Sequence, residues 1–523
     1  MTPTVRLLVL VGLITTKPCA GLLVQPRILE SRADDATLLL HIHENLIISL
    51  ERTSILAEEL FITSSKGIGS ETLVLYGREL ENDLYLNRRH QSALAVKALE
   101  NGVEVRGMLT NKLRIAPVRV QRLDDGASLH ELVKVRERTD DSKEKTYETS
   151  TSLDSEEDES SIAYYDDTDE SMEEEECGSS SSSGDEYYQE IDDSQKDPPN
   201  ETSASNETFT VETCFVTSEN YTKAFSTLED LVAYLATMLN AVALRFLDMT
   251  RPMIRFQLNH VITNMSDEVI LINTTNNQVD VNATLENMKL LSMKGVFNRC
   301  DIAVLMTSED LVYIEDEEIG SRVDGMAFTG GVCGSEKVAV VEDTPLTYNG
   351  VHRLAHEIAH LLGASHDNES ASVKFPGYPG SESCSWNDGY LMSYCEGGRN
   401  KYTLSNCSRE QIRFTYRNLS NHCTDVNEDA CYTSDSYPGH NMTRRKFCRL
   451  MHLGEPTAKP EHKHSERHMR CRIKCCWKLE EDVPVCQVHS MSEGLKCAPG
   501  KSCRRGICAR HQWNRRITTS AHM

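Results

Sequence analysis

Residues 22 to about 138 alternate apolar and polar side chains over short runs, most clearly at 94–99 and 103–109. A period of two is typical of β-strands that bury one face. The pattern therefore predicts a β-rich region without a catalytic constellation. An ordinary β-rich binding domain is the plain alternative to any special role for it.

From residue 209 the pattern predicts a mixture of strands and helices. A strand is expected to open near 209–211, and buried strands are expected at 301–306 and 323–328. Residues 228–246 carry apolar side chains at helical spacing, which indicates an amphipathic core helix. With a further helix after residue 350, this order predicts an α/β (α+β) domain with a cleft.

Charge changes the picture between residues 146 and 195, where Asp and Glu are frequent and Lys and Arg are absent. Such a stretch cannot bury enough apolar surface to offset the entropy of ordering. We expect a disordered acidic linker over 139–208.

The first residues predict secretion. Arg6 precedes an apolar run at 7–14 and small residues near Cys19, which indicates a signal peptide over 1–21. Later apolar runs are too short for a membrane span, and eighteen cysteines favour an oxidising compartment. Asn-x-Ser/Thr sequons add the expectation of a glycoprotein. We expect a secreted, extracellular protein with no nucleic-acid partner.

Residues 429–523 are basic and rich in cysteine, which predicts a small module held by disulfides. Its positive charge predicts attraction to a sulfated glycosaminoglycan, and a solvated basic surface without a partner is equally open. The arginines and lysine that would carry this attraction are Arg444, Arg445, Lys446, Arg504, Arg505, Arg515 and Arg516.

The strongest chemical signal begins at His356. His356 and His360 are four residues apart, so a helix projects both imidazoles from one face toward one metal ion. Glu357 lies beside them as a candidate general base, and Gly363 allows a sharp turn that returns His366 as third ligand. Three protein ligands leave one position open, which is typical of a catalytic zinc ion. The alternative, a chance HExxH match in a helix, is weakened by the length of the motif.

These residues resemble the metzincin metalloproteases. Asp367 directly after the third histidine is similar to the reprolysin or ADAM-type branch, and residues 390–394 resemble its Met-turn, with Met392 beneath the metal. The run 386–390 is similar to secreted metalloproteases of tick saliva. Residues 495–508 resemble the cysteine-rich modules of ADAMTS-type proteases.

The resemblance implies a zinc endopeptidase, made as a zymogen, that cleaves extracellular proteins. It implies a propeptide domain over 22–138, a catalytic domain over 209–428, and a water activated by Glu357. A catalytically silent secreted binding protein is the competing hypothesis, and the intact ligands and Glu357 argue against it.

Two further sites follow only from the resemblance. Cys177 could fill the open zinc position as a cysteine switch, and an unrelated linker thiol is the equal alternative. Calcium is bound by many relatives, and the best matching carboxylates here are Glu212, Asp301 and Asp425. Seven cysteines lie between 214 and 423, so at least one pairs outside this set or stays free.

Overall fold

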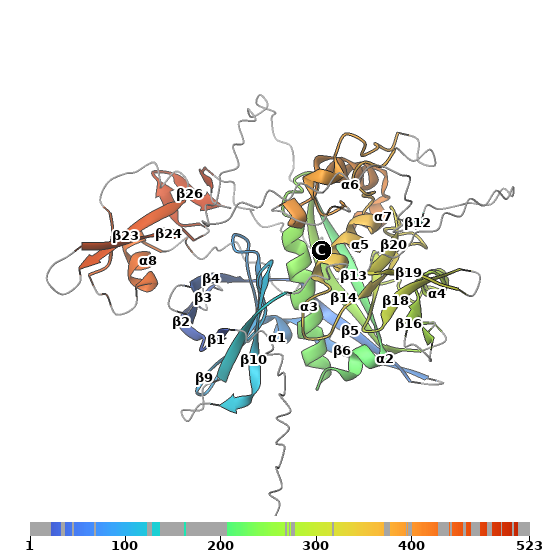
Figure 1. Cartoon of the computed structure of the whole chain (residues 1–523), viewed down its shortest axis with the longest axis horizontal. Coiled ribbons are helices and arrows are strands. Elements are labelled where there is room, and N and C mark those ends of the chain that lie inside the picture. The colour runs from blue at the N-terminus through green and yellow to red at the C-terminus, as the bar shows by residue number, and fades with distance from the viewer. Residues whose placement is uncertain are drawn as a thin grey trace, which may run out of the picture.

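The structure is a computed structural model of the chain (Figure 1). It describes residues 22–135, 162–163, 207–426 and 439–510, with gaps at 33–36, 44–45, 67–68, 123–127, 267–268, 271, 274–277, 316–317, 371–376, 394, 396–399, 440–441, 453–454, 456, 462–470, 479–483, 493 and 505–506. The predicted signal peptide, Cys177 and nearly all of the predicted linker lie outside the described residues.

Antiparallel strands of the N-terminal region form a sheet in the order β1-β11-β10-β9-β8-β7-β4-β3-β2. β8 and β9 are strands where the sequence alternation predicts them. One face of the sheet packs a core of its own that includes Leu40, Ile48 and Val105. The strands are β1 (Leu22–Val24), β2 (Arg27–Arg32), β3 (Thr37–His43), β4 (Leu46–Arg52), β7 (Leu84–Asn87), β8 (Ser92–Leu99), β9 (Gly102–Thr110), β10 (Leu113–Arg122) and β11 (Ser128–Lys134).

A second, mostly parallel sheet is the centre of the molecule, in the order β12-β20-β21-β17-β13-β14-β5-β6. Every residue of β17 and β21 is buried, as expected for strands covered on both faces. The predicted strands at 209–211 and 301–306 lie within β13 and β17. The strands are β5 (Leu56–Lys66), β6 (Gly69–Tyr76), β12 (Ile162–Ala163), β13 (Thr208–Ser218), β14 (Met253–Met265), β17 (Ile302–Thr307), β20 (Gly325–Phe328) and β21 (Val338–Glu342).

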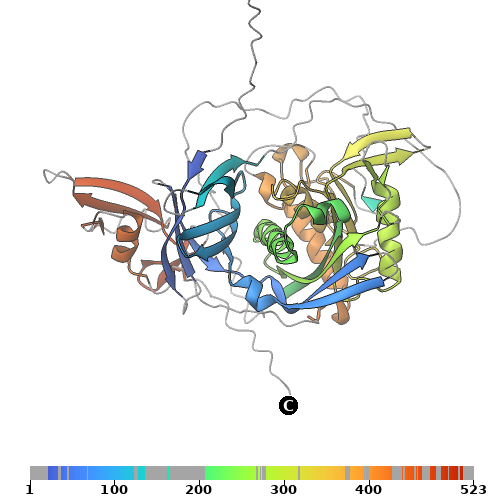
Figure 2. The ribbon, with the colours of Figure 1, turned by 90° about the horizontal axis from the view of Figure 1, so that it is seen from below.

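Helix α3 lies between the two sheets (Figures 1 and 2). It packs on β14 and α5 on one side and on β7, β8 and β9 on the other. Its first turn is capped by the Thr227 hydroxyl, which accepts a hydrogen bond from the Asp230 N–H. The helices are α1 (Gly77–Glu81), α2 (Glu219–Lys223), α3 (Leu228–Arg245), α4 (Val281–Met293), α5 (Val351–Leu361), η1 (Trp386–Asp388), η2 (Asn400–Tyr402), α6 (Asn406–Asn418), α7 (Asn421–Thr424) and α8 (Arg444–Met451). None of these described helices is long and apolar enough to cross a membrane.

The strand predicted over 323–328 is divided between two sheets. Val323 ends β19 (Glu318–Val323), which belongs to a small sheet in the order β15-β16-β18-β19, whereas β20 begins at Gly325 in the central sheet. The break falls at Asp324, whose side chain pairs with Arg353 at 2.8 Å. The prediction of one strand was wrong because the apolar pattern runs through this corner. The other strands of the small sheet are β15 (Ile272–Asn273), β16 (Gln278–Asp280) and β18 (Asp310–Glu315).

The C-terminal module combines α8 with two small sheets and a core made largely of cysteine. Its disulfides join Cys448 to Cys475, Cys471 to Cys503, Cys476 to Cys486 and Cys497 to Cys508. The predicted disulfide-held module is thus observed. Its strands are β22 (Lys459–Pro460), β23 (Arg472–Lys478), β24 (Pro484–Ser490), β25 (Lys496–Ala498), β26 (Lys501–Arg504) and β27 (Ile507–Ala509).

Disulfides also connect the segments around the central sheet. Six of the seven cysteines between 214 and 423 pair with one another, as Cys214–Cys300, Cys333–Cys423 and Cys384–Cys407. Cys395 is disulfide-bonded as well. Because the other six are used up, its partner lies outside this set, which is one of the two possibilities that the odd number left open.

Candidate metal centre

Helix α5 carries the first two histidines and the glutamate of the motif. Its start is fixed by Asp343, whose carboxylate accepts a hydrogen bond from the Gly350 N–H at 2.8 Å. Leu354 and Ile358 are buried in the hydrophobic cluster that also contains side chains of α3 and β13, which we call the main core. The helix packs on β20 and β21. This packing fixes the helix so that His356, Glu357 and His360 are all buried.

Gly363 ends the helix in a conformation that other residues rarely adopt, with φ at +107°. A Cβ at this position would lie 1.9 Å from the Thr415 Oγ1 atom of α6. Glycine is therefore required twice, for its backbone angle and for the close approach of α6. The turn brings His366 back to the two helical histidines.

The Nε2 atoms of the three histidines converge. The separations are 3.1 Å for His356 and His360, 3.1 Å for His360 and His366, and 3.2 Å for His356 and His366. Ligands at about 2.0 to 2.1 Å from one tetrahedral zinc ion lie about 3.3 Å apart. The observed spacing fits such an ion closely.

The outer ring nitrogens fix the tautomers. The Nδ1 atom of His356 lies 2.8 Å from the Leu391 carbonyl, and that of His360 lies 2.7 Å from the Ala364 carbonyl. Carbonyl oxygens only accept, so the proton of each ring is on Nδ1 and the Nε2 atom presents a lone pair. Lone pairs at this separation repel one another unless a cation lies among them. The residues present therefore fit a bound metal ion.

Glu369 completes this outer set, since its carboxylate lies 2.7 Å from the Nδ1 atom of His366. Glu369 was missed from the sequence, although a carboxylate three residues after the third histidine could have suggested it. A histidine ligand that donates its outer N–H to a carboxylate is oriented and made a stronger base.

Burial keeps two of the three histidines uncharged. It lowers the pKa of His356 to about 3, with the nearby His366 as second cause, and lowers the pKa of His360 well below its ordinary value. Neutral imidazoles are the form that binds metal.

Glu357 is buried beside the ligands on α5, and burial raises the pKa of its carboxyl well above the ordinary value, with the Asp324 charge adding to this. A Cβ at Gly325 of β20 would lie 2.7 Å from the Glu357 Oε1 atom, so the carboxylate is in close contact with this strand. Glu357 is therefore held against strand β20.

The segment of Met392 runs against the third histidine. The Asp367 N–H donates to the Met392 carbonyl at 2.8 Å, and the Asp367 carboxylate accepts from the Ser405 hydroxyl at 2.5 Å. The Met392 side chain is fully buried in the main core. The structure therefore brings together the motif and the predicted Met-turn.

The predicted calcium ligands are only partly brought together. Asp301 accepts a hydrogen bond from the Glu212 N–H at 2.9 Å, but Asp425 is exposed. Among the described residues these three carboxylates do not form a group with ligand oxygens within 4.8 Å of one another. Burial raises the pKa of Asp301 to about 7, which does not favour a calcium ligand. Calcium binding stays a prediction without geometric support.

The histidine cluster lies within a segment that matches a known metallopeptidase family. Residues 206–405 match Reprolysin_5, described as metallo-peptidase family M12. They form a metallopeptidase domain of the reprolysin branch.

One similar protein, from Bombyx mori, is named "A disintegrin and metalloproteinase with thrombospondin motifs like". It is 27% identical to this chain, and the match covers 53% of this chain and 40% of the relative. A venom metalloproteinase of Olivierus martensii is 27% identical over 41% of this chain and 54% of the relative. The chain thus spans about half or less of these relatives. Metalloproteinase-II of Bacteroides fragilis is a solved structure at 10% identity and a TM-score of 0.32, covering 75% of this chain and 91% of its own. The finer resemblance to tick salivary enzymes stays a prediction.

Proposed function

We propose that this protein is a secreted zinc endopeptidase, made as a zymogen, that hydrolyses peptide bonds of extracellular proteins. The observation that carries the proposal is the convergence of three imidazole Nε2 atoms beside a buried glutamate. His356, His360 and His366 would hold the ion. Bound there, zinc would supply a Lewis acid that polarises the scissile carbonyl and acidifies water.

Glu357 is the proton carrier of the proposed reaction. Its carboxylate accepts a proton from the attacking water and passes it to the leaving amine. A cation held by the neighbouring histidines favours the ionised carboxylate that this role needs.

Strand β20 offers a place for an extended substrate. It pairs with β21 on one side and, on the other, antiparallel with β12, as Ile162 opposite Phe328 and Ala163 opposite Ala327. A substrate strand added here would be bound by main-chain hydrogen bonds and would tolerate many sequences. The chain's own β12 occupies this edge, which supports a latent full-length form.

The proposal is tested by Glu357→Ala after any activating cleavage of the chain. We expect turnover of a generic protein substrate to fall about 10²- to 10⁴-fold while zinc content stays at one ion per chain. His360→Ala should instead lose the metal. An alanine variant at 357 that cleaves as fast as the parent would sink the mechanism.

Two finer predictions remain without structural support. Cys177, the predicted switch, lies outside the described residues. In the basic C-terminal module, Lys446 pairs with Glu30 at 2.8 Å, so part of the charge predicted to attract a sulfated glycosaminoglycan already has an internal partner.

A further inference from the structure

We propose that residues 22–134 are a permanent subunit of the protease, which stays bound without a covalent link when the chain is cut between residues 135 and 207. The binding surface is formed by β14 and α3 of the metallopeptidase domain. We call the contact between these elements and residues 22–134 the N-terminal seam. The inference does not depend on peptidase activity.

The first part of the seam is a continuous sheet. β5 pairs in parallel with β14, with Phe61 opposite His260 and Ser64 opposite Thr263. The Leu258 N–H also donates to the Ile55 carbonyl at 2.6 Å. Loss of β5 would strip the partners from this edge of β14 and expose its backbone groups.

The second part is a shared hydrophobic core. Apolar side chains of the N-terminal region are fully buried in the same cluster as Leu354 and Ile358 of the zinc helix. Each buried Leu or Ile contributes roughly a 10- to 100-fold factor to association. The contributing side chains are Ile55, Leu56, Leu60, Ile62, Leu84, Ala93 and Met108.

The third part is the far side of α3, which the N-terminal sheet covers. The Thr53 hydroxyl donates to the Asn240 side-chain oxygen at 2.7 Å, and both side chains are buried. Gly107 lets the sheet approach closely, since a Cβ there would lie 3.1 Å from the Thr237 methyl group. Without the sheet, Asn240 and the neighbouring apolar side chains would face water. Helix α3 is therefore kept buried by the central sheet on one side and by the N-terminal sheet on the other.

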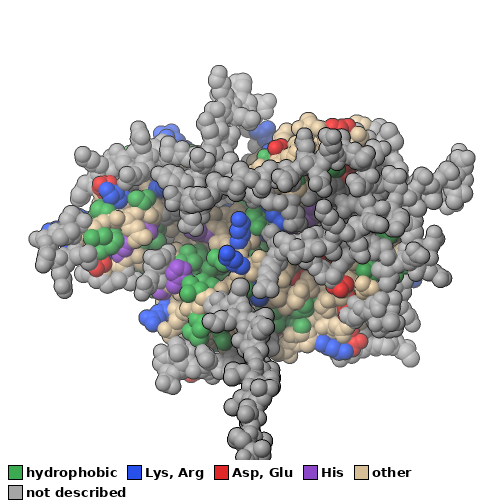
Figure 3. Space-filling view, in the orientation of Figure 1, with side chains coloured by type: hydrophobic (Ala, Val, Ile, Leu, Met, Phe, Trp, Pro, Cys, Tyr) green, Lys and Arg blue, Asp and Glu red, His purple; other side chains and the backbone are tan. Residues whose placement is uncertain are grey.

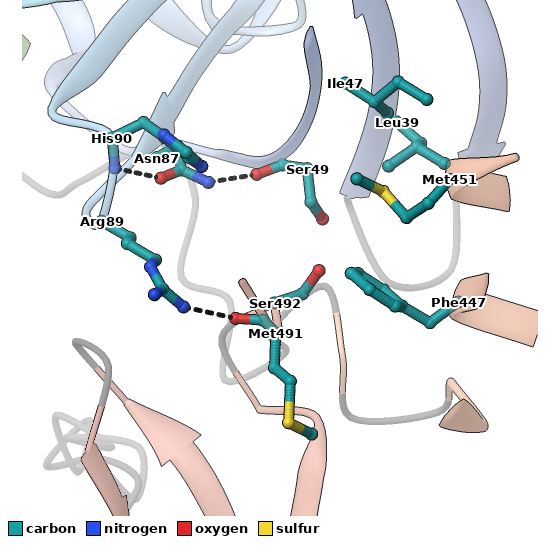
Figure 4. A pocket seen from close by; sticks show the side chains of 10 residues that line it. All are labelled: Leu39, Ile47, Ser49, Asn87, Arg89, His90, Phe447, Met451, Met491 and Ser492. Carbon is teal, nitrogen blue, oxygen red and sulfur yellow. Dashed lines mark hydrogen bonds between the residues drawn. The ribbon is translucent and has the colours of Figure 1, made fainter. Parts of the chain in front are cut away.

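The C-terminal module holds the N-terminal region from the opposite side (Figures 1 and 2). Arg89 donates to the carbonyls of Cys471 and Met491, both at 3.2 Å. Phe447 and Met451 of α8 line a cavity of about 30 Å³ together with Leu39 and Ile47 of the N-terminal sheet (Figure 4). In the view of Figure 3, hydrophobic side chains and histidines gather on the surface beside the module. The N-terminal region is therefore held on both sides.

Cutting one peptide bond between residues 135 and 207 adds one water molecule and breaks none of these contacts. Residues 22–138 contain no cysteine, so noncovalent contacts alone would hold the fragment, chiefly those of the N-terminal seam and of the module. A propeptide that is readily released would instead leave behind a domain with its own complete sheet and core.

The test places a site-specific protease sequence between residues 146 and 160 of the full chain, upstream of Cys177. After cutting, we expect both fragments to co-elute in size-exclusion chromatography at the volume of the uncut protein, including in 1 M salt. In urea the N-terminal fragment should leave only within the main unfolding transition. Separate elution in native buffer, with the remainder still folded by near-ultraviolet circular dichroism, would overturn the proposal.

A matched pair of variants tests whether the N-terminal seam retains the fragment. Thr53→Val removes the bond to buried Asn240 and should speed fragment loss about tenfold, because a buried acceptor loses its donor. Thr110→Val makes the same chemical change at the end of β9, where the hydroxyl accepts from the nearby N–H groups of Lys112 and Leu113. Equal effects of the two variants would show that the N-terminal seam is not what retains the fragment.

Discussion

Glu369 is expected to strengthen zinc binding although it does not touch the metal. Two of the three histidine ligands donate their outer N–H to main-chain carbonyls, of Leu391 and Ala364, which no substitution removes. His366 alone donates to a side chain, the Glu369 carboxylate at 2.7 Å. Glu369→Ala therefore tests one outer contact and leaves all three ligands in place.

The size of the effect follows from the position of Glu369. Loss of an outer partner of a histidine ligand weakens metal affinity 10- to 100-fold. The Glu369 side chain is 41% exposed, so water can replace it in part and solvent screens its charge. We expect a loss of zinc affinity at the lower end of this range, about tenfold, which equals about 1.4 kcal/mol of binding free energy. Glu369→Gln keeps an accepting oxygen without the charge. Its zinc affinity should lie between that of Glu369→Ala and that of the parent.

The assay is competition for zinc between the purified protein and a chromophoric chelator, which reads affinity without activity. Glu382→Ala is the matched control, because Glu382 is an exposed glutamate in the same loop region. Glu369→Ala leaves the Asn-x-Ser sequon at Asn368 intact, so glycosylation is not altered by the change. Thermal melting of the metal-free variants should show that the fold is unchanged.

The reasoning would be refuted if Glu369→Ala and the parent bound zinc within about twofold of one another. It would also fail if the control at Glu382 lost as much affinity as Glu369→Ala.

Two other predictions concern residues outside the ligand set. Gly325→Ala should lower turnover with little change in zinc affinity, because the new Cβ would lie 2.7 Å from Glu357 Oε1 and push the carboxylate aside; unchanged turnover with normal zinc content would contradict it. Burial raises the pKa of Glu81 to about 7 from 4.5, so the folded state holds this proton more tightly than the unfolded state. Relative to Glu81→Gln, the parent therefore has its highest free energy of unfolding below pH 4.5. This difference falls by about 3 kcal/mol as pH rises through 7. Urea midpoints at pH 5 and pH 8 check the sign, and a parent whose stability relative to Glu81→Gln stays constant or rises between these pH values would contradict it.

Local patterns predicted the parts of this fold that neighbouring residues determine. The alternation at 94–99 and 103–109 became β8 and β9 because one face of each strand is buried. The spacing of His356, His360 and His366 predicted one cluster because helix geometry and a glycine turn fix it within eleven residues. These inferences needed no knowledge of distant contacts.

Contacts distant in sequence were not predictable in the same way. The alternating pattern of β5 says that it is a strand but not that its neighbour is β14, about 200 residues later. Glu369 was missed because its role depends on which way one loop side chain points. The break at Asp324 was missed because apolar residues lie on both sides of it, Val323 at the end of β19 and Met326 in β20, and only the different sheets separate the two strands.

The division into a region at 22–138 and a catalytic domain at 209–428 describes order along the chain, and its boundaries stay predictions. In space, α3 contacts both the N-terminal sheet and the zinc helix α5. A change that loosens the N-terminal sheet therefore reaches the zinc ligands through one rigid helix, since packed interiors transmit strain. The zinc affinity of the cut protein should then stay that of the whole chain for as long as the N-terminal fragment remains bound.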